Sequence, residues 1–166
     1  MIAYRDAVPA DAAPFAAAAR ASFIETFGHL YAPHDLATFL EGWSDEAFRG
    51  ELEDPRFHIR LATDDERIAG FAKLGPPDLP VEPRAAQLWQ LYVLQPWQGT
   101  GVAAALMDWA LAQARADGHA CLHLSVFVDN HRARRFYARY GAVDVGRYDF
   151  PVGDQIDEDR ILRIDL

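Results

Sequence analysis

The stretch Gln98-Gly99-Thr100-Gly101-Val102-Ala103 separates an apolar run, Leu88–Leu94, from a segment with the apolar spacing of an amphipathic helix. A strand that breaks into a glycine-bearing turn at the start of a helix exposes backbone N–H groups that have no partner within the helix. The helix dipole adds about half a positive charge at the same end. Because glycine has no Cβ, a ligand can lie directly against the main chain. The stretch therefore predicts a phosphate-binding turn.

The composition indicates a folded, acidic chain. Its 166 residues carry a formal net charge of −9, and 51% of them are hydrophobic and 12% aromatic. This length and apolar content predict one domain over residues 1–166 with a buried core. The acidic balance argues against nucleic acid as a partner. It also means that local N–H groups have to hold any phosphate-bearing cofactor, because the overall charge repels it.

Cysteine and histidine usage excludes several kinds of site. Cys121 is the only cysteine, so neither an intramolecular disulfide nor a multi-cysteine zinc site can form. The histidines form no cluster in the sequence, and we expect no metal. No signal peptide is visible, and no apolar run approaches the roughly 18 residues that span a bilayer. We expect a cytoplasmic protein without a membrane partner.

Strands and helices are expected to alternate along the chain. After a first strand at 2–6, Asp11 is expected to cap a helix that runs to about Phe27 and ends at Gly28. A second helical region covers roughly Pro33–Glu53, and prolines mark an exposed loop over 76–83. The further strands are expected at Phe57–Thr63, Arg67–Leu74, Gln87–Leu94, Cys121–Val128, 142–149 and 157–165. This order predicts a mixed α/β sheet in three layers.

Two more helices are expected after the glycine-bearing stretch. The helix over 101–116 is expected to end at Asp117-Gly118, and a short helix over Asn130–Tyr140 is expected to end at Gly141. The apolar face predicted for the first of them consists of Val102, Ala105, Leu106, Trp109 and Ala112.

Two motifs in this order resemble the Gcn5-related N-acetyltransferase (GNAT) superfamily, and the resemblance covers nearly the whole chain. The first, residues 91–103, is similar to the family's cofactor signature Q/R-x-x-G-x-G/A, with Gln98, Gly101 and Ala103 at the defined positions. The second, residues 130–141, resembles the family's N-x-x-A-x-x-x-Y-x-x-x-G element, from Asn130 through Tyr137 to Gly141. Each motif lies at a junction of strand and helix.

The resemblance implies both a fold and a co-substrate. The implied fold is α/β (α+β), a GNAT-type three-layer fold with a mixed, mostly antiparallel central sheet of six to seven strands and about four helices. The implied co-substrate is acetyl-CoA, with its pyrophosphate at the glycine-bearing turn and its pantetheine arm along the preceding strand. The residues implied to contact it are Leu91, Tyr92, Val93, Gln98, Gly99, Thr100, Gly101, Val102, Ala103, Asn130 and Tyr137.

Tyr137 is the residue that the chemistry favours as proton donor. Attack of an amine on a thioester expels a thiolate, whose conjugate acid has a pKa of about 8.5, whereas the pKa of tyrosine is near 10. A phenol close to the sulfur stays protonated at neutral pH and can donate as the thiolate forms. The resemblance places the family's general acid at the same position. Alternatively, Tyr137 packs in the core, because it shares an apolar stripe at helical spacing with Ala133, Phe136 and Tyr140.

Other polar side chains of this segment also have two interpretations. Asn130 is placed to cap a helix, and the resemblance implies that it also lies near the cofactor arm. Arg132, Arg135 and Arg139 share a helix face that either contacts the ribose phosphate of the cofactor or is solvated.

The sequence leaves the general base open. A protonated amine must lose a proton before attack, since its free electron pair is the nucleophile. Many members of the family carry a glutamate on the central strand or on the strand before the asparagine, where this sequence has Gln87 and Ser125. Neither of these can act as a base. The candidates that remain are Glu25, His34, Asp35 and Glu41, and a water relay or uptake of a neutral amine are the alternatives.

Substrate choice is expected in the segment that joins the first two helices, Thr26–His34. This segment, the tail over 150–154 and Asp159 resemble a branch of the superfamily related to polyamine and small-amine acetyltransferases. The residues expected to bind the acceptor are Phe27, Tyr31 and His34. Their aromatic rings, together with that of Trp43, either stack on a cation or pack beneath the sheet.

The sequence thus predicts an acetyl-CoA-dependent N-acetyltransferase that acts on a primary amine of a small molecule, by direct attack in a ternary complex. Catalysis would rest mainly on positioning, with a backbone N–H of strand 91–94 donated to the oxyanion. The alternatives are acetylation of a protein N-terminus or lysine, a CoA-binding module without turnover, and an interaction domain that keeps only the fold. The oligomeric state is open, with a homodimer as one possibility.

Overall fold

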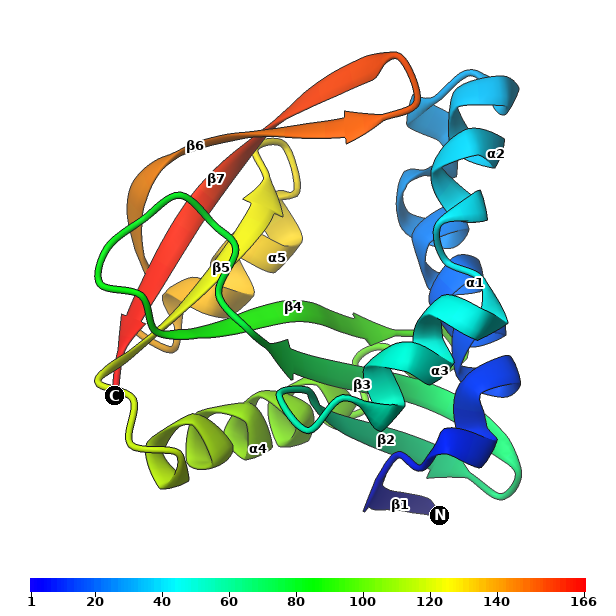
Figure 1. Cartoon of the computed structure of the whole chain (residues 1–166), viewed down its shortest axis with the longest axis horizontal. Coiled ribbons are helices and arrows are strands. Elements are labelled where there is room, and N and C mark those ends of the chain that lie inside the picture. Colours follow the sequence, from blue (N-terminus) through cyan, green and yellow to red (C-terminus); the bar gives the residue numbers. More distant parts are fainter.

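One seven-stranded sheet, in the order β1-β2-β3-β4-β5-β7-β6, runs through the computed structural model, which describes residues 1–166 (Figure 1). The strands are β1 (Ile2–Asp6), β2 (His58–Asp64), β3 (Arg67–Gly75), β4 (Ala86–Val93), β5 (Cys121–Phe127), β6 (Val143–Val152) and β7 (Gln155–Asp165). All neighbours pair antiparallel except β4 and β5, which are parallel. The predicted mixed, mostly antiparallel sheet is confirmed.

Five α-helices accompany the sheet: α1 (Ala12–Phe27), α2 (Pro33–Glu41), α3 (Asp45–Glu53), α4 (Val102–Ala116) and α5 (His131–Ala138). The count exceeds the expected four because the region over 33–53 is two helices. Gly42 ends α2, and the Ser44 hydroxyl then accepts a hydrogen bond from the Ala47 N–H at 3.1 Å and caps α3. None of the helices is long and apolar enough to cross a bilayer.

Each face of the sheet packs against its own helices, which gives the three predicted layers (Figure 1). On one face, Phe15 of α1 packs edge-on against Phe48 of α3 and Phe71 of β3, with ring centroids 4.6 and 4.8 Å apart. On the other face, α4 and α5 share a second apolar cluster with the sheet, which includes Leu106 and Tyr137. Removing such aromatic and aliphatic surface from water is the main stabilising contribution to the fold.

Three local predictions are corrected by the structure. The buried face of α4 includes Val102 and Leu106 as predicted, but it continues through Met107, Ala110, Leu111 and Ala114, while Ala112 is exposed. Asp11 stands at the start of α1 without capping it, because its carboxylate accepts from the Arg5 guanidinium at 2.7 Å and from the Val8 N–H at 2.8 Å. The loop over 76–83 is not wholly exposed, since Leu79 is buried.

The central feature of the sheet is that β4 and β5 pair over a short stretch and then diverge. They pair only at Ala86 with Leu122 and at Gln87 with His123. Beyond these two pairs the strands diverge, while β4 continues to Val93 alongside β3 (Figure 1). From Leu88 onward, the edge of β4 that faces β5 therefore has no strand partner.

Candidate active site

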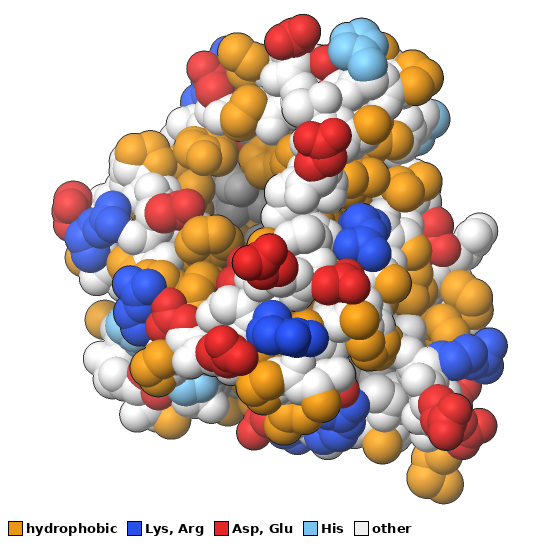
Figure 2. Space-filling view, turned by 45° about the vertical axis from the view of Figure 1, so that its right-hand side comes forward, with side chains coloured by type: hydrophobic (Ala, Val, Ile, Leu, Met, Phe, Trp, Pro, Cys, Tyr) orange, Lys and Arg blue, Asp and Glu red, His pale blue; other side chains and the backbone are white.

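The divergence of β4 and β5 opens a cleft of about 790 Å³. Its walls come from strands β3, β4, β5, β6 and β7 and from all five helices or the turns beside them. Figure 2 shows a recess bordered by hydrophobic side chains on this side of the molecule. A cleft of this size with mainly apolar walls is typical of a site for a small molecule or cofactor.

The turn between β4 and α4 lies at one end of the cleft and presents free backbone donors. The N–H of Gln98 donates to the carbonyl of Gln95 at 3.2 Å, whereas the N–H groups of residues 99–103 donate to no acceptor within the chain. Gly99 and Gly101 have φ angles of +76° and +90°, which L side chains adopt at a cost. The two glycines therefore turn these N–H groups outward at the start of α4, where the helix dipole favours an anion.

Two side chains connect this turn to the rest of the cleft. The Gln98 amide donates to the Val93 carbonyl at 3.0 Å and accepts from the Arg132 guanidinium of α5 at 2.6 Å. Arg132 and Arg139 line the cleft, but Arg135 does not. Of the three predicted arginines, Arg132 is the one that a hydrogen bond joins to the anion-binding turn.

Tyr137 of α5 is buried and lines the cleft. Burial raises the pKa of its phenol, so Tyr137 is protonated at neutral pH. Asn130 caps α5, because its side-chain oxygen accepts from the Ala133 N–H at 3.2 Å, and it also lines the cleft. Both interpretations of Asn130 are compatible with this placement. For Tyr137, a core contact and a place in the cleft occur together.

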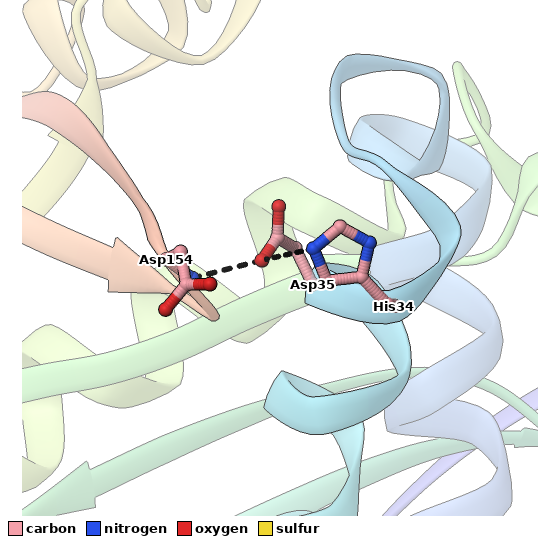
Figure 3. Close-up of side chains that lie close together, drawn as sticks. All are labelled: His34, Asp35 and Asp154. Atoms are coloured by element: carbon pink, nitrogen blue, oxygen red, sulfur yellow. Dashed lines mark hydrogen bonds and ion pairs between the residues drawn. The ribbon is translucent and has the colours of Figure 1, made fainter.

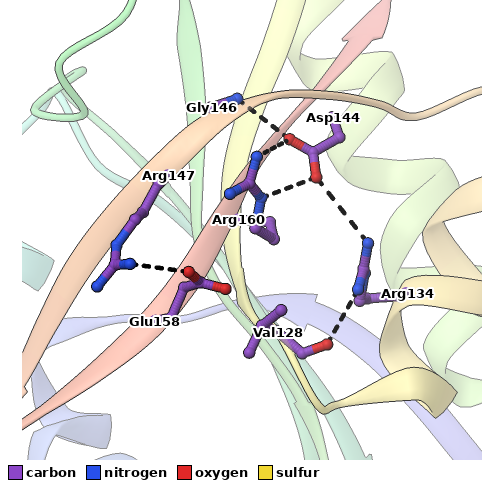
Figure 4. Close-up of polar contacts among 7 residues, drawn as sticks. All are labelled: Val128, Arg134, Asp144, Gly146, Arg147, Glu158 and Arg160. Atoms are coloured by element: carbon purple, nitrogen blue, oxygen red, sulfur yellow. Dashed lines mark hydrogen bonds and ion pairs between the residues drawn. The ribbon is translucent and has the colours of Figure 1, made fainter.

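A polar network fixes α5 relative to the sheet (Figure 4). Arg134 of α5 donates to the Val128 carbonyl at 3.0 Å and lies 3.9 Å from the Asp144 carboxylate of β6. Asp144 also accepts two hydrogen bonds of 2.9 Å from Arg160 of β7. The network thereby holds the helix that carries Tyr137 against β6 and β7.

The other end of the cleft is aromatic. The rings that line it are those of Phe23, Phe27, Tyr31, Phe39, Trp43, Phe127 and Phe150. Several of them contact one another, with the ring centroid of Phe23 4.6 Å from that of Phe39 and 5.3 Å from that of Trp43. Phe27 and Tyr31, predicted to bind the acceptor, belong to this wall. Such rings can pack against an apolar body or face a cation.

Two buried aspartates of β7 stand at this aromatic end. The Tyr31 hydroxyl donates a short hydrogen bond to Asp157, which also accepts from the Gln155 amide at 2.9 Å. Burial raises the pKa of Asp159 to about 6, the nearby negative charge of Asp157 adds to the rise, and a hydrogen bond from Ser125 opposes it. Sequence reasoning named Asp159 only within the resemblance to the small-amine branch and assigned neither aspartate to the site. The signal was the alternation Asp157-x-Asp159-x-Ile161, which puts two acids on the buried face of a strand.

A third carboxylate of the cleft is neutralised by a lysine. Lys73 of β3 is buried, and its ammonium lies 2.7 Å from the Glu51 carboxylate of α3. Burial lowers the pKa of Lys73, while the charge of Glu51 opposes the shift. The ammonium also faces the ring of Phe48 at 4.9 Å. This ion pair leaves no free charge in its part of the cleft.

His34 is exposed and does not line the cleft. It lies 3.3 Å from the Asp35 carboxylate, and Asp35 in turn accepts from the Asp154 N–H at 2.8 Å (Figure 3). Gly153, at φ +59°, permits this approach, since a Cβ there would come within 2.4 Å of the Asp35 carboxylate. The predicted acceptor residue His34 thus belongs to a contact that ties α2 to the turn between β6 and β7.

A sheet with parted central strands, a donor-rich turn at a helix start and a tyrosine beside the opening together define the class of GNAT-type acetyltransferases. Comparison with known proteins agrees, because the sequence matches the acetyltransferase (GNAT) family over residues 19–142. An uncharacterized N-acetyltransferase of Mycobacterium tuberculosis (strain H37Rv) is 36% identical over 153 residues, which cover 92% of this chain and 96% of the relative. The chain therefore belongs to the GNAT family and is an N-acetyltransferase.

Two other matches describe the range of similar proteins. The aminoalkylphosphonate N-acetyltransferase of Salmonella typhimurium is 31% identical over 108 residues, which cover 64% of this chain and 67% of that protein. The solved structure of the PaiA N-acetyltransferase of Thermoplasma acidophilum, in complex with coenzyme A, has a TM-score of 0.80 at 19% identity. It covers 100% of this chain and 99% of that one, and the likeness shows the shared fold.

Proposed function

We propose that this protein transfers the acetyl group of acetyl-CoA to a primary amine of a small molecule, by direct attack within a ternary complex. The observation that carries the proposal is that one cleft joins the free N–H groups of residues 99–103 to an aromatic and acidic compartment and is also lined by Tyr137. A thioester bound from one end can meet an amine bound from the other. Holding the two reactants together supplies most of the catalysis.

The backbone would hold most of the cofactor. The N–H groups at the start of α4 suit the pyrophosphate, and the open edge of β4 suits the amides of the pantetheine arm. Arg132, which donates to Gln98, adds positive charge at the same end, and Arg139 also lines the cleft. The proposed contacts are Leu91, Tyr92, Val93, Gln98, Gly99, Thr100, Gly101, Val102, Ala103, Asn130 and Tyr137. A backbone N–H from this part of β4 would also stabilise the oxyanion as the amine attacks.

Tyr137 would act as the general acid. As the amine attacks, the bond between the carbonyl carbon and sulfur breaks and the sulfur takes up negative charge. A buried phenol with a raised pKa is fully protonated and can donate its proton to that thiolate.

The acceptor end supports a small, cationic amine. Aromatic rings and buried carboxylates favour an ammonium group on an apolar or extended body, which includes polyamines. The hydrogen bond from the Asp154 N–H to Asp35 holds the turn after β6 against α2, and a cleft whose walls are tied together in this way suits a small acceptor better than a protein chain. The name of the Salmonella relative also supports a small amine, but the carboxylates here disfavour an additional phosphonate group.

The test measures CoA release with a thiol reagent over a panel of acceptors. The panel holds 2-phenylethylamine, putrescine, spermidine, 2-aminoethylphosphonate and a short peptide with a free N-terminus. We expect release with the cationic amines and little with the phosphonate or the peptide. Tight CoA binding without release for any acceptor would instead indicate a binding module, and the absence of CoA binding would reject the proposal.

The variant Tyr137→Phe tests the general acid. We expect kcat to fall about 100-fold or more, while the Kd for CoA stays close to that of the unaltered enzyme, because only the proton donor is lost. Tyr140→Phe is the matched control, since Tyr140 lies in the turn just after α5 and does not line the cleft. An unchanged kcat in Tyr137→Phe would remove this residue from the mechanism.

A further inference from the structure

The reaction needs a group that takes a proton from the acceptor ammonium, and the candidates seen in the sequence lie outside the cleft. Glu25 is exposed and accepts from the Gln95 N–H at 3.1 Å, and Asp35 accepts from the Asp154 N–H. His34 and Glu41 are exposed. None of these four lines the cleft.

Gln87, which stands where many members of the family carry a glutamate, is also occupied. Its amide oxygen accepts from the N–H groups of Asp78 and Leu79 at 2.8 and 3.1 Å, and its amide nitrogen donates to the Asp78 carboxylate at 2.7 Å. Gln87 therefore fixes the loop before β4 and does not point a free polar group at the reacting atoms.

Three carboxylates do line the cleft, and they differ in their partners. Glu51 is paired with the Lys73 ammonium, and Asp157 accepts hydrogen bonds from Tyr31 and Gln155. Asp159 has no ion-pair partner and is 6% exposed. It is therefore the carboxylate with unused capacity to accept a proton.

We infer that Asp159 is the general base, which receives the proton of the acceptor ammonium at the aromatic end of the cleft. This inference rests on the proposed function. Asp159 of β7 pairs with Phe127 of β5. Ser125, also on β5, donates a hydrogen bond to the Asp159 carboxylate. Many members of the family have a glutamate where this chain has Ser125 of β5. The Asp159 carboxylate, supplied by β7, would take over the role of base from that position.

The surroundings of Asp159 suit this role. The titratable groups that face it are Asp157 on its own strand, Tyr92 of β4, Tyr148 of β6 and Tyr31 after α1. No cation is among them. Burial raises the pKa of Asp159 to about 6, so that it is ionised at neutral pH and more basic than an ordinary aspartate.

The protons balance over one turnover. The ammonium gives its first proton to the Asp159 carboxylate, and the free electron pair of nitrogen attacks the thioester carbon. The C–S bond then breaks, and the thiolate takes a proton from Tyr137. The second proton of nitrogen restores the Tyr137 phenol, while Asp159 releases its proton to solvent. The products are the N-substituted acetamide, free CoA and one proton.

The test compares pH profiles of kcat/KM for 2-phenylethylamine or putrescine. In the unaltered enzyme we expect activity to fall as the pH drops below about 6, because Asp159 becomes protonated. Asp159→Asn should lower kcat about 100-fold or more at pH 7.5 and abolish this decline. With 2,2,2-trifluoroethylamine, which is largely neutral at that pH, the loss should be much smaller, because the acceptor needs no base.

Substitutions of two residues next to Asp159 should shift the acidic limb of the pH profile, which is the fall in kcat/KM at low pH, in opposite directions. Ser125→Ala removes a hydrogen bond that lowers the pKa of Asp159, so the limb should shift to higher pH. Asp157→Asn removes a negative charge that raises this pKa, so the limb should shift to lower pH. A purely structural role for Asp159 predicts neither shift. Asp165→Asn, an exposed position on the same strand, is the matched control.

A second readout does not depend on turnover. Carbon-13 NMR of the aspartate carboxyl groups, with Asp159→Asn for assignment, measures the pKa of Asp159 directly. A value near 6 that changes when 2-phenylethylamine binds supports the inference, and a value near 4 overturns it. Full activity of Asp159→Asn, or an unchanged pH profile, also overturns it. CoA release by the unaltered enzyme is measured separately. No release with any amine would reject the proposed function, whereas normal release with full activity of the variant would reject only the role of Asp159.

Discussion

A buried, unpaired carboxylate is expected to weaken the fold at neutral pH, and Asp159 makes this measurable. Burial raises its pKa from the model-peptide value of 3.8 to about 6, so the folded protein binds the proton more tightly than the unfolded chain does. The stability that the protonated group contributes is present at low pH and is lost as the pH rises through the window between these values. The substitution Asp159→Asn removes the ionisation at nearly constant size.

The size of the effect follows from the shift in pKa. A rise from 3.8 to about 6 corresponds to about 3 kcal/mol when the group is fully ionised. Solvent in the open cleft screens part of this, which leaves about 2 kcal/mol. Asp159→Asn is therefore expected to raise the free energy of unfolding by about 2 kcal/mol at pH 7.5 while it lowers activity.

Urea unfolding without cofactor, followed by tryptophan fluorescence at pH 7.5 and at pH 4, measures this difference. At pH 4 the folded protein already holds the proton on Asp159, so the variant and the unaltered protein should differ by less than about 1 kcal/mol. The exposed control Asp165→Asn should change stability by less than about 0.5 kcal/mol at either pH. Loss of stability in Asp159→Asn at pH 7.5, or the same gain at both pH values, would refute the reasoning.

Three other substitutions test separate parts of the structure. Gly101→Ala places a Cβ at a φ of +90° and should cost about 1–2 kcal/mol of stability and weaken CoA binding, measured by thermal unfolding and calorimetry; unchanged CoA affinity would contradict the proposed phosphate site. Glu51→Gln leaves the Lys73 ammonium buried without its partner and should cost about 3 kcal/mol in urea unfolding, most of it recovered when Lys73→Met is added. Leu106→Ala opens a cavity under the sheet at a fully buried position, and a loss outside about 2–5 kcal/mol would show that α4 packs differently.

Local features of the fold could be predicted from the sequence because neighbouring residues determine them. The turn at Gly99 and Gly101 needs positive φ angles, and the cap at Asn130 needs a side-chain oxygen next to a helix start. Both signals lie within a few residues of the structure that they specify. Asp11 is the exception, because an arginine from the first strand competes for its carboxylate.

The acidic part of the candidate site could not be predicted in the same way, because it depends on pairing between distant strands. Asp159 reaches the cleft only because β7 inserts between β5 and β6, so that it lies across from Phe127. Likewise, the side-chain amide of Gln87 is hydrogen-bonded to the loop before β4. The prolines at 76–83 predict that a loop is present but not the path that it takes. The buried face of α4 was misjudged at Ala112 because the helix contacts several strands at once and only those contacts decide which side is covered.

The short pairing between β4 and β5 has a consequence for how such an enzyme diverges. A ligand arm that lies along the open edge of β4 would be recognised through main-chain groups, which every residue except proline supplies in full. Side chains on that strand are then free to vary as long as the backbone keeps its course. The rings and carboxylates at the opposite end have no such freedom, because their own chemistry selects the acceptor. New acceptor preferences can therefore arise by substitutions at one end, while recognition of the acetyl donor is inherited unchanged.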